Sequence, residues 1–364
     1  MKNTFGNNVS YTLFGESHGD EIGIVIDGLA PGIKIDTDFI RLQLDRRRPS
    51  GRISTSRTET DEFRIVSGIW NGRTTGTPIC IIIPNTNKKS GDYSSLAVLP
   101  RPGHADYTAM CKYHGFQDYR GGGHFSGRLT APLVAAGAIA LSALSQKDIY
   151  IGTHIKSLAG INDRKFDNEN LKRDIASLSK STFPVLDQLS GEAMREEAEK
   201  AASEGDSVGG ILETTVIGMP SGVGEPWFDS VESILAHALY SIPAVKGVAF
   251  GDGFDLANMR GSRANDAFVT DGRTVSTKTN HNGGINGGIT NGMPIVFSVA
   301  IKPTPSIYCE QETVDLKLME NAKLKIEGRH DPTIVHRAAP VVDAVTAMVL
   351  CDILCGRYGT DYLS

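Results

Sequence analysis

The stretch VSYTLFGESHGDEIGIVID, residues 9–27, determines how the fold begins. Two short apolar runs, residues 9–14 and 21–27, flank the turn-forming sequence Gly15-Glu16-Ser17-His18-Gly19. Runs rich in β-branched and aromatic residues and bounded by glycine or aspartate are typical of strands, so both runs are predicted to be strands. The polar turn between them is a candidate functional loop, because loops held by a rigid scaffold often carry binding or catalytic side chains.

Further elements follow this stretch without a repeating order. Asp36 is a predicted N-cap of a helix that ends at Arg48, before Pro49. More strands are predicted at residues 78–84, 210–217, 245–250 and 294–301, helices at residues 128–147, 230–240 and 336–355, and peripheral helices within residues 161–204. The glycine-rich turns do not follow a regular strand-helix-strand rhythm, which favours an α+β fold over a doubly wound sheet.

Composition limits the class of protein without choosing its function. The chain has 364 residues, with 37 Lys and Arg against 42 Asp and Glu, and the net charge of −5 argues against a nucleic-acid-binding protein. We find no apolar stretch long enough to span a membrane and no signal-peptide core. The five cysteines include no Cys-x-x-Cys pair, so reduced thiols explain them better than disulfides or zinc. These features predict a cytoplasmic enzyme without a metal centre.

A dense group of arginines stands out in this acidic chain. Arg46, Arg47 and Arg48 are consecutive, and Arg52 and Arg57 follow closely. Such a local excess of positive charge predicts an anionic ligand. The alternative is a solvated patch on the surface.

Two more turn-forming motifs carry polar side chains. The sequence Gly121-Gly122-Gly123-His124-Phe125-Ser126-Gly127-Arg128 lies in the middle of the chain, and Gly328-Arg329-His330-Asp331-Pro332 lies near its end. Neither a dinucleotide-binding glycine fingerprint nor a Gly-Lys-Ser/Thr phosphate loop is present.

Two histidines in such surroundings are candidates for proton transfer. His18 lies between Ser17 and Gly19 in the first polar turn, where it suits the role of a proton donor. His104 follows Arg101-Pro102-Gly103 and precedes residues that are predicted to be helical. At a helix N-terminus the dipole disfavours the imidazolium and tunes the ring as a proton shuttle.

The three motifs, in this order, resemble the signature set of chorismate synthase, and the resemblance covers residues 5–357. It implies an α+β fold that is a β-α-β sandwich, with central antiparallel sheets and helices packed outside, in one catalytic domain of residues 1–364. It also implies the family's reaction, an anti-1,4-elimination of phosphate and a proton from 5-enolpyruvylshikimate 3-phosphate to give chorismate. This is the last common step of the shikimate pathway to aromatic amino acids. Reduced FMN, used without net redox change, and a homotetramer are implied by the family alone.

The resemblance also implies roles for catalytic residues. His18 and His104 match the two active-site histidines, which are assigned to the leaving phosphate and to protonation at the reduced flavin. Asp331 matches an aspartate that faces the flavin and takes part in proton removal. Ser17 and Ser126 match serines that support this relay.

The binding residues come from the same comparison of motifs. FMN contacts are expected at His124, Phe125, Ser126, Pro243, Ala244, Gly287, Lys302, Pro303, Thr304, Pro305, Ser306 and Arg329. Arg47 and Arg52 fall where some members are assigned nicotinamide contacts, which makes NADPH a candidate reductant; the sequence leaves open whether an external reductant is used instead. Substrate contacts are expected at Arg47, Arg128 and Arg337, because a phosphate and two carboxylates need several cations and arginine suits bidentate contacts.

The sequence departs from the family pattern at a few of these positions. The middle motif commonly reads Arg-Ser-Ser-Ala-Arg-Glu-Thr, whereas this chain has His124-Phe125-Ser126-Gly127-Arg128-Leu129-Thr130, and Asn is usual where Pro243 stands. Altered FMN contacts are expected. Two rival functions are another FMN-dependent oxidoreductase acting on a small anionic substrate and a non-catalytic phospholigand-binding protein.

Overall fold

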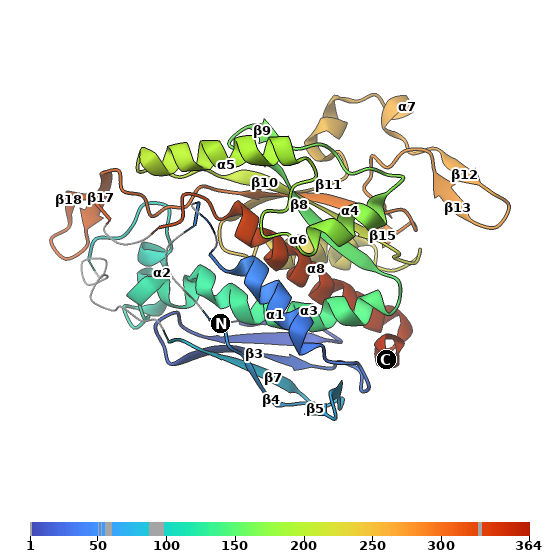
Figure 1. Ribbon diagram of the computed structural model, residues 1–364, viewed down its shortest axis with the longest axis horizontal. Helices are drawn as coiled ribbons and strands as arrows, with labels where there is room; N and C mark the ends of the chain where they lie inside the picture. Colours follow the sequence, from blue (N-terminus) through green and yellow to red (C-terminus); the bar gives the residue numbers. More distant parts are fainter. Residues whose placement is uncertain (1, 50, 52, 55–59, 87–97, 327–329) are drawn as a thin grey trace.

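A first sheet of five strands is built from the beginning of the chain. The computed structural model describes every residue except 1, 50, 52, 55–59, 87–97 and 327–329 (Figure 1). The strand order is β1 (Thr4–Phe5), β2 (Ser10–Gly15), β3 (Glu21–Asp27), β7 (Ile79–Pro84) and β4 (Arg64–Ser67), and all neighbours are antiparallel. In β7 the side chains of Ile79, Ile81 and Ile83 alternate toward the core, as a sheet with one buried face requires. The strands predicted on both sides of the first turn are confirmed.

A second antiparallel sheet of five strands lies on the opposite side of the molecule (Figure 1). Its order is β11 (Val245–Phe250), β16 (Ile295–Ile301), β10 (Gly210–Ile217), β8 (Tyr150–Leu158) and β9 (Ile161–Asn162). The sequence predicts β10, β11 and β16 but not β8. Most residues of β8 are buried on both faces of the sheet, so the strand lacks the alternation of polar and apolar residues that marks a half-exposed strand.

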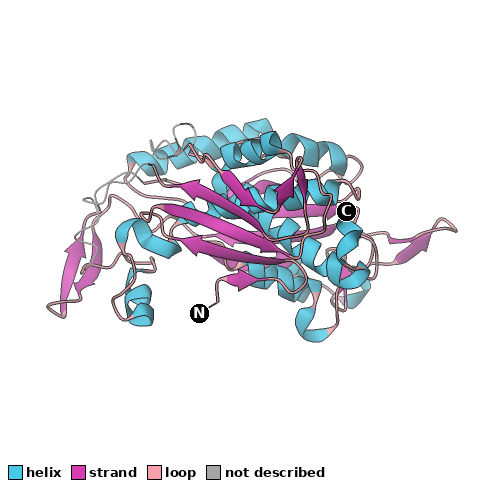
Figure 2. Cartoon of the chain, turned by 90° about the horizontal axis from the view of Figure 1, so that it is seen from below, coloured by secondary structure: helices cyan, strands magenta, loops and turns pink. Residues whose placement is uncertain are grey.

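Three helices form the layer between the two sheets: α1 (Thr37–Arg47), α3 (Thr130–Ser145) and α8 (Val335–Tyr358). α3 packs on β3 and β7, α8 packs on β8 and β10, and the two helices pack on each other. A Cβ on Gly137 would lie 2.2 Å from that of Ala344, so this glycine permits their close approach. Seen from below, the first sheet lies in front of these helices (Figure 2).

The α+β class predicted from the sequence is confirmed. The expected position of the helices outside the sheets does not hold for α3 and α8. Both helices are apolar and buried on nearly every side. The surface of such a helix is shielded from water only when other elements cover all of its faces, so these helices lie between the sheets.

The remaining helices and turns are shorter. The other α-helices of the described residues are α2 (Asp106–Tyr113), α4 (Leu171–Leu178), α5 (Gln188–Ser203), α6 (Val231–Leu239) and α7 (Gly261–Ala264). The 3-10 turns are η2 (Arg120–Phe125), η3 (Gly127–Leu129), η4 (Trp227–Asp229), η5 (Gly253–Asn258) and η6 (Thr360–Leu363). α4 and α5 confirm the helices predicted within residues 161–204, and α6 confirms the one predicted at residues 230–240.

Four short hairpins complete the described part of the fold. They are β5 (Ile69–Trp70) with β6 (Arg73–Thr74), β12 (Phe268–Thr270) with β13 (Val275–Thr277), β14 (Ile285–Asn286) with β15 (Ile289–Thr290), and β17 (Gln311–Asp315) with β18 (Glu320–Leu324). The β12–β13 and β17–β18 hairpins project from opposite ends of the molecule (Figure 1).

The far end of α8 ties down the start of the chain. The carboxylate of Asp352 accepts hydrogen bonds from the backbone N–H groups of Asn7, Asn8 and Val9, at 2.6 to 3.1 Å. Asp352 is only 2% exposed, and the converging amide dipoles compensate its buried charge. Among the described residues, one large cluster of buried apolar side chains runs through both sheets and the helices between them, and a small separate cluster contains Leu324 and Ile326.

Within the described residues, two helices are long and apolar enough to cross a membrane, so the prediction that no such stretch exists was wrong about length. They are the segment Gly127–Ser145 and α8. However, 72% and 94% of their most apolar windows are buried inside the molecule. This burial is typical of the core helices of a soluble protein.

Candidate active site

A cavity of about 1000 Å³ brings most of the predicted site residues together. Its volume lies at the upper end of the range for small-molecule sites and leaves room for a cofactor beside a substrate. The predicted residues in its wall are Arg47, His104, His124, Phe125, Ser126, Arg128, Pro243, Ala244, Lys302, Thr304, Pro305, Ser306, Asp331 and Arg337.

Other predicted residues lie elsewhere. Four described ones do not line the cavity: Ser17, His18, Pro303 and Gly287. Gly287 sits in the turn between β14 and β15, where its φ of 62° explains the glycine without a ligand. Pro303 lies between wall residues but does not reach the wall itself. Arg52 and Arg329 fall outside the described residues.

The three glycines of the middle motif bring the two predicted catalytic histidines to one turn. Gly121, Gly122 and Gly123 have φ angles of 58°, 85° and 53°, in the left-handed region that glycine tolerates. A Cβ on Gly121 would lie 2.2 Å from the ring of His18, and one on Gly122 would lie 3.1 Å from the ring of His104. The two rings therefore pack directly on consecutive residues of the backbone.

Ser17 orients His18 behind this turn. Its Oγ lies 3.0 Å from His18 Nδ1 and 3.2 and 3.1 Å from the backbone oxygens of Arg120 and Gly121. Carbonyl oxygens only accept hydrogen bonds, so the single hydroxyl hydrogen is best donated to one of them. His18 Nδ1–H then donates to Ser17 Oγ, an arrangement that favours this tautomer of the neutral ring.

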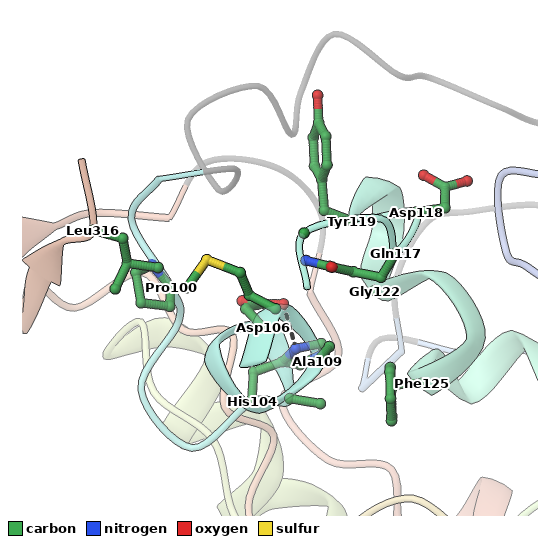
Figure 3. Close-up of a pocket in the computed structure, with 13 residues that line it drawn as sticks. Pro100, His104, Asp106, Ala109, Gln117, Asp118, Tyr119, Gly122, Phe125 and Leu316 are labelled. Atoms are coloured by element: carbon green, nitrogen blue, oxygen red, sulfur yellow. Dashed lines mark ion pairs between the residues drawn. The ribbon is translucent and has the colours of Figure 1, made fainter. Parts of the chain in front are cut away.

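His104 is held by a network that the sequence analysis did not predict. Its Nδ1 lies 2.7 Å from Asp106 Oδ1 (Figure 3). Arg101 binds the same carboxylate with Nε and Nη2, each at 2.8 Å. Burial raises the pKa of Asp106, but hydrogen bonds from Arg101 and His104 outweigh it and hold the pKa well below its usual range. His104 Nδ1–H therefore faces a carboxylate. α2 begins two residues after His104, as predicted.

A smaller pocket of about 200 Å³ lies on the α2 side of the same histidine (Figure 3). His104 and Phe125 belong to the walls of both spaces, whereas Asp106 lines only the smaller one. His104 thus contacts two cavities.

Arg47 and Arg128 meet on one buried carboxylate. Asp61 Oδ2 lies 2.7 Å from Arg47 Nη2, and Asp61 Oδ1 contacts Arg128 Nη1. Both arginines line the cavity, whereas the fully buried Asp61 does not. Burial raises the pKa of Asp61, but Arg47 and Arg128 outweigh burial and lower the pKa to about 2.

The arginine cluster is not a solvated patch at its centre. Arg46 and Arg47 are each only 2% exposed, and Arg46 Nη1 lies 3.1 Å from Asp343 of α8. Of the two, only Arg47 lines the cavity. The surface interpretation is therefore wrong for these two residues.

Arg337 joins the third motif to this cluster. Its Nη1 donates to Asp331 Oδ2 at 2.6 Å, and its Nε donates to the backbone oxygen of Arg47 at 2.8 Å. The first turn of α8 is thereby fixed to the end of α1. The three arginines predicted to bind substrate, Arg47, Arg128 and Arg337, form one connected group in the cavity wall.

The cavity wall fits a flavin nucleotide in its chemistry. It combines apolar side chains, including Leu13, Leu133 and Met348, with Lys246 and Lys302. A flat aromatic ring system needs the first kind of surface, and a terminal phosphate needs the second. Burial, with a smaller effect of Lys246, lowers the pKa of Lys302.

Two further features favour a ligand at this wall. Ala244 holds a φ of 73°, an unusual value for a residue with a Cβ and one that often marks functional sites. His124 Nδ1–H donates to the backbone oxygen of Gly15 at 2.8 Å, which fixes its ring. Within the described ranges, no group of three or more His, Cys, Asp or Glu side chains is arranged to hold a metal ion.

Three side chains that complete the site were not predicted: Arg101, Asp106 and Asp61. A signal for the first two was available, because they flank His104 at positions i−3 and i+2 of one motif. Asp61 has no local signal, since its partners Arg47 and Arg128 are 14 and 67 residues away in the sequence.

Comparisons with known proteins agree on one family. A family model described as chorismate synthase matches residues 9–355. Curated chorismate synthases of Thermococcus gammatolerans and Pyrococcus abyssi are each 48% identical, over 353 and 352 residues, and each alignment covers 97% of both proteins. A solved structure described as a crystal structure of chorismate synthase matches with a TM-score of 0.77 and 28% identity, covering 98% of this chain and 95% of that one.

Proposed function

The chain belongs to the chorismate synthase family, and we propose that the 1000 Å³ cavity is its active site. The reaction removes phosphate and a proton from 5-enolpyruvylshikimate 3-phosphate and yields chorismate without net oxidation. One observation carries the assignment of the site. The two histidines pack on consecutive glycines of one turn, and one of them, His104, lines the cavity together with three connected arginines.

Binding of the substrate is assigned to the arginines. Arg47, Arg128 and Arg337 present a connected cationic wall to a molecule that carries a phosphate and two carboxylates. Guanidinium groups form bidentate hydrogen bonds with both kinds of anion and stay charged at every working pH. Ser126 supports this wall because its Oγ accepts a hydrogen bond from the backbone N–H of Arg128 at 3.3 Å.

The cofactor is assigned to the other wall residues. Reduced FMN, when bound, supplies transient electron donation to the substrate. Lys302, Thr304 and Ser306, with His124 and Phe125, would hold it. His124 and Phe125 replace residues usual in the family, so their contacts with FMN differ from the common pattern.

Protonation of the leaving phosphate is assigned to His18. Because Ser17 Oγ accepts a hydrogen bond from Nδ1–H, Nε2 is the atom that delivers and regains a proton. His18 packs behind Gly121 and does not line the cavity, so the phosphate must reach the edge of this turn or a water molecule must bridge the gap. General acid catalysis of this kind contributes roughly 10²- to 10⁴-fold in rate.

The two other proton-transfer groups face the cavity directly. His104 donates its Nδ1–H to Asp106, which leaves Nε2 as the atom that exchanges a proton with the reacting molecules. Asp331 is assigned to removal of the substrate proton, and its bond to Arg337 orients its carboxylate.

An anaerobic assay tests this function against its rivals. Purified enzyme with photoreduced FMN and substrate should release phosphate and chorismate in equal amounts, while the flavin stays reduced after many turnovers. An FMN oxidoreductase would consume one reduced flavin per turnover, and a binding protein would release neither product. Adding NADPH in the dark, without photoreduction, tests whether the chain reduces its own flavin through a nicotinamide contact at Arg47.

We further propose that the enzyme is a cytoplasmic homotetramer and that residues 1–364 form one catalytic domain, as in the family. The large core that runs through both sheets supports one domain. The layer order of sheet, helices and sheet supports the family's β-α-β sandwich. Light scattering coupled to gel filtration measures the subunit number.

A further inference from the structure

We propose that Asp61 is a positioning residue of the active site: it holds Arg47 and Arg128 in the relative geometry that receives the anionic groups of the substrate. This inference rests on the proposed function, because it takes the cavity as the substrate site. Asp61 does not line the cavity and acts only through the two arginines, which do.

The contacts join elements from distant parts of the sequence. Arg47 comes from the last turn of α1 and Arg128 from η3, and one carboxylate oxygen of Asp61 serves each of them. Arg128 is also anchored through Nε to Asn85 Oδ1 at 3.1 Å. The side-chain amide of Asn85 in turn donates to the backbone oxygens of Glu16 and Gly19, each at 3.0 Å. The turn that carries His18 is therefore linked to the same arginine.

Electrostatics explains why one carboxylate is placed there. Two buried guanidinium groups close together repel each other, and a carboxylate between them offsets both the repulsion and the cost of burial. Arg48 Nε lies 3.7 Å from Asp61 Oδ2, and the charge of Arg48 is balanced by Asp45, 2.5 Å from its Nη1. Among the described residues the cluster therefore keeps an excess of positive charge. This excess attracts an anion from the cavity side while Asp61 fixes the arginines from behind.

The backbone conformation of Asp61 allows a substitution that removes only the charge. Its φ of 47° lies in the left-handed region. Apart from glycine, Asn and Asp are among the residues that most often adopt this conformation. Asp61→Asn therefore keeps the shape and the backbone conformation while it removes the charge.

The test measures the dissociation constant of 5-enolpyruvylshikimate 3-phosphate for enzyme loaded with oxidised FMN, together with KM and kcat. We expect Asp61→Asn to raise the dissociation constant and KM at least tenfold and to change kcat less than threefold, since uniform binding is lost. Asp174→Asn is the matched control. Asp174 is also buried and gripped by an arginine, at 2.9 and 3.0 Å from Arg164, but it lies outside the cavity, so its replacement should leave the dissociation constant unchanged.

A reference variant, Arg128→Gln, separates this inference from the proposed function. If neither Arg128→Gln nor Asp61→Asn changes the dissociation constant, the cavity is not the substrate site and the proposed function loses its location. If Arg128→Gln weakens binding and Asp61→Asn does not, the positioning role of Asp61 is overturned. Tighter binding in Asp61→Asn would also overturn it, because Asp61 would then compete with the substrate for the arginines.

A further variant keeps the test decisive if Asp61→Asn does not fold. Asp61→Glu keeps the charge but moves the carboxylate by one methylene, and it should raise the dissociation constant at least threefold; an unchanged value overturns the proposal. Where Asp61→Asn folds, its combination with Arg128→Gln should raise the dissociation constant by less than the product of the two single effects; an increase equal to that product overturns the coupling of Asp61 to Arg128.

Discussion

Each histidine or arginine assigned to the reaction is held by a second side chain. Asp106 accepts a hydrogen bond from Nδ1–H of His104, and Ser17 Oγ accepts one from Nδ1–H of His18. Asp331 forms an ion pair with Arg337. A group fixed before the substrate arrives needs less reorganisation during the reaction, which is how preorganised sites lower barriers. The partners are therefore as testable as the groups they hold.

Asp106→Asn should lower kcat by about 10- to 100-fold with KM within threefold, because an amide does not stabilise the imidazolium form of His104. The 15N NMR signals of His104 should also lose the pattern of a ring with its hydrogen on Nδ1. Asp252→Asn is the control, since Asp252 lies 2.5 Å from His281 Nδ1 and outside the cavity. Unchanged kcat and NMR signals in Asp106→Asn would contradict the role.

Asp331→Asn should bind substrate and oxidised FMN within threefold of the wild type. Asparagine keeps the size and one acceptor oxygen but cannot take a proton at neutral pH. Single-turnover formation of chorismate, followed by anaerobic rapid quench with photoreduced FMN, should slow by on the order of 10²- to 10⁴-fold. Wild-type rates would make Asp331 an ordinary turn residue before Pro332.

Sequence reasoning predicted the groups that meet the ligand better than the groups behind them. His104, Asp331 and the arginines carry motif signals. Asp61 does not, because its significance comes from a contact between segments that fold together only in three dimensions. Gly287 illustrates the opposite error, a residue that was predicted to contact the ligand but does not line the cavity. A glycine in a tight hairpin and a glycine beside a ligand cannot be distinguished from the local sequence.

At the scale of an element, the glycine turn of η2 decides the distance between the two histidines. Gly121→Ala should lower kcat at least 100-fold, because the new Cβ would lie 2.2 Å from the ring of His18 and 2.8 Å from Ser17 Oγ. Gly160→Ala is the matched control: its φ of 85° imposes a similar backbone strain, but no atom lies within 4 Å of the added Cβ. Similar losses of activity in the two variants would assign the effect to backbone strain alone.

The regular elements were largely predictable, and their arrangement in layers was not. Apolar runs and an N-cap predicted β3, β7, α1 and α8, because those signals are local. The position of α3 and α8 between the sheets depends on the packing of α3 on β3 and β7, the packing of α8 on β8 and β10, and the close contact of the two helices at Gly137. No single window of sequence contains that information, and β8 lacked even the usual alternation.

For the whole molecule, a buried histidine at the start of α8 predicts sensitivity to acid. Burial, with smaller effects of Arg337 and Arg195, lowers the pKa of His336 to about 3, against an ordinary value of about 6.5. Between these values the unfolded chain binds a proton that the folded chain does not. The free energy of unfolding therefore falls as the pH decreases below 6.5, by about 2 kcal/mol at pH 5.

The variant His336→Gln tests this pH dependence by urea unfolding at pH 7 and pH 5. It removes the titrating group and keeps a partner for Ser54, whose Oγ lies 3.0 Å from His336 Nε2. Between the two pH values the wild type should lose about 2 kcal/mol more than the variant. Equal losses in both proteins would remove His336 from the acid response.

The hydrogen bonds between Asp352 and the amides of residues 7–9 can form only late in translation, which delays completion of the fold in the cell. Asp352 and Val9 are 343 residues apart, and at 5 to 20 residues per second a ribosome needs roughly 20 to 70 seconds to add that length. Until α3 (Thr130–Ser145) has been added, the emerging first sheet exposes the apolar face on which this helix packs, and throughout the interval the amides of residues 7–9 have water as their partner. The nascent chain therefore completes its core only after nearly all of it has been translated, and chaperones that shield exposed strands have a long window in which to act.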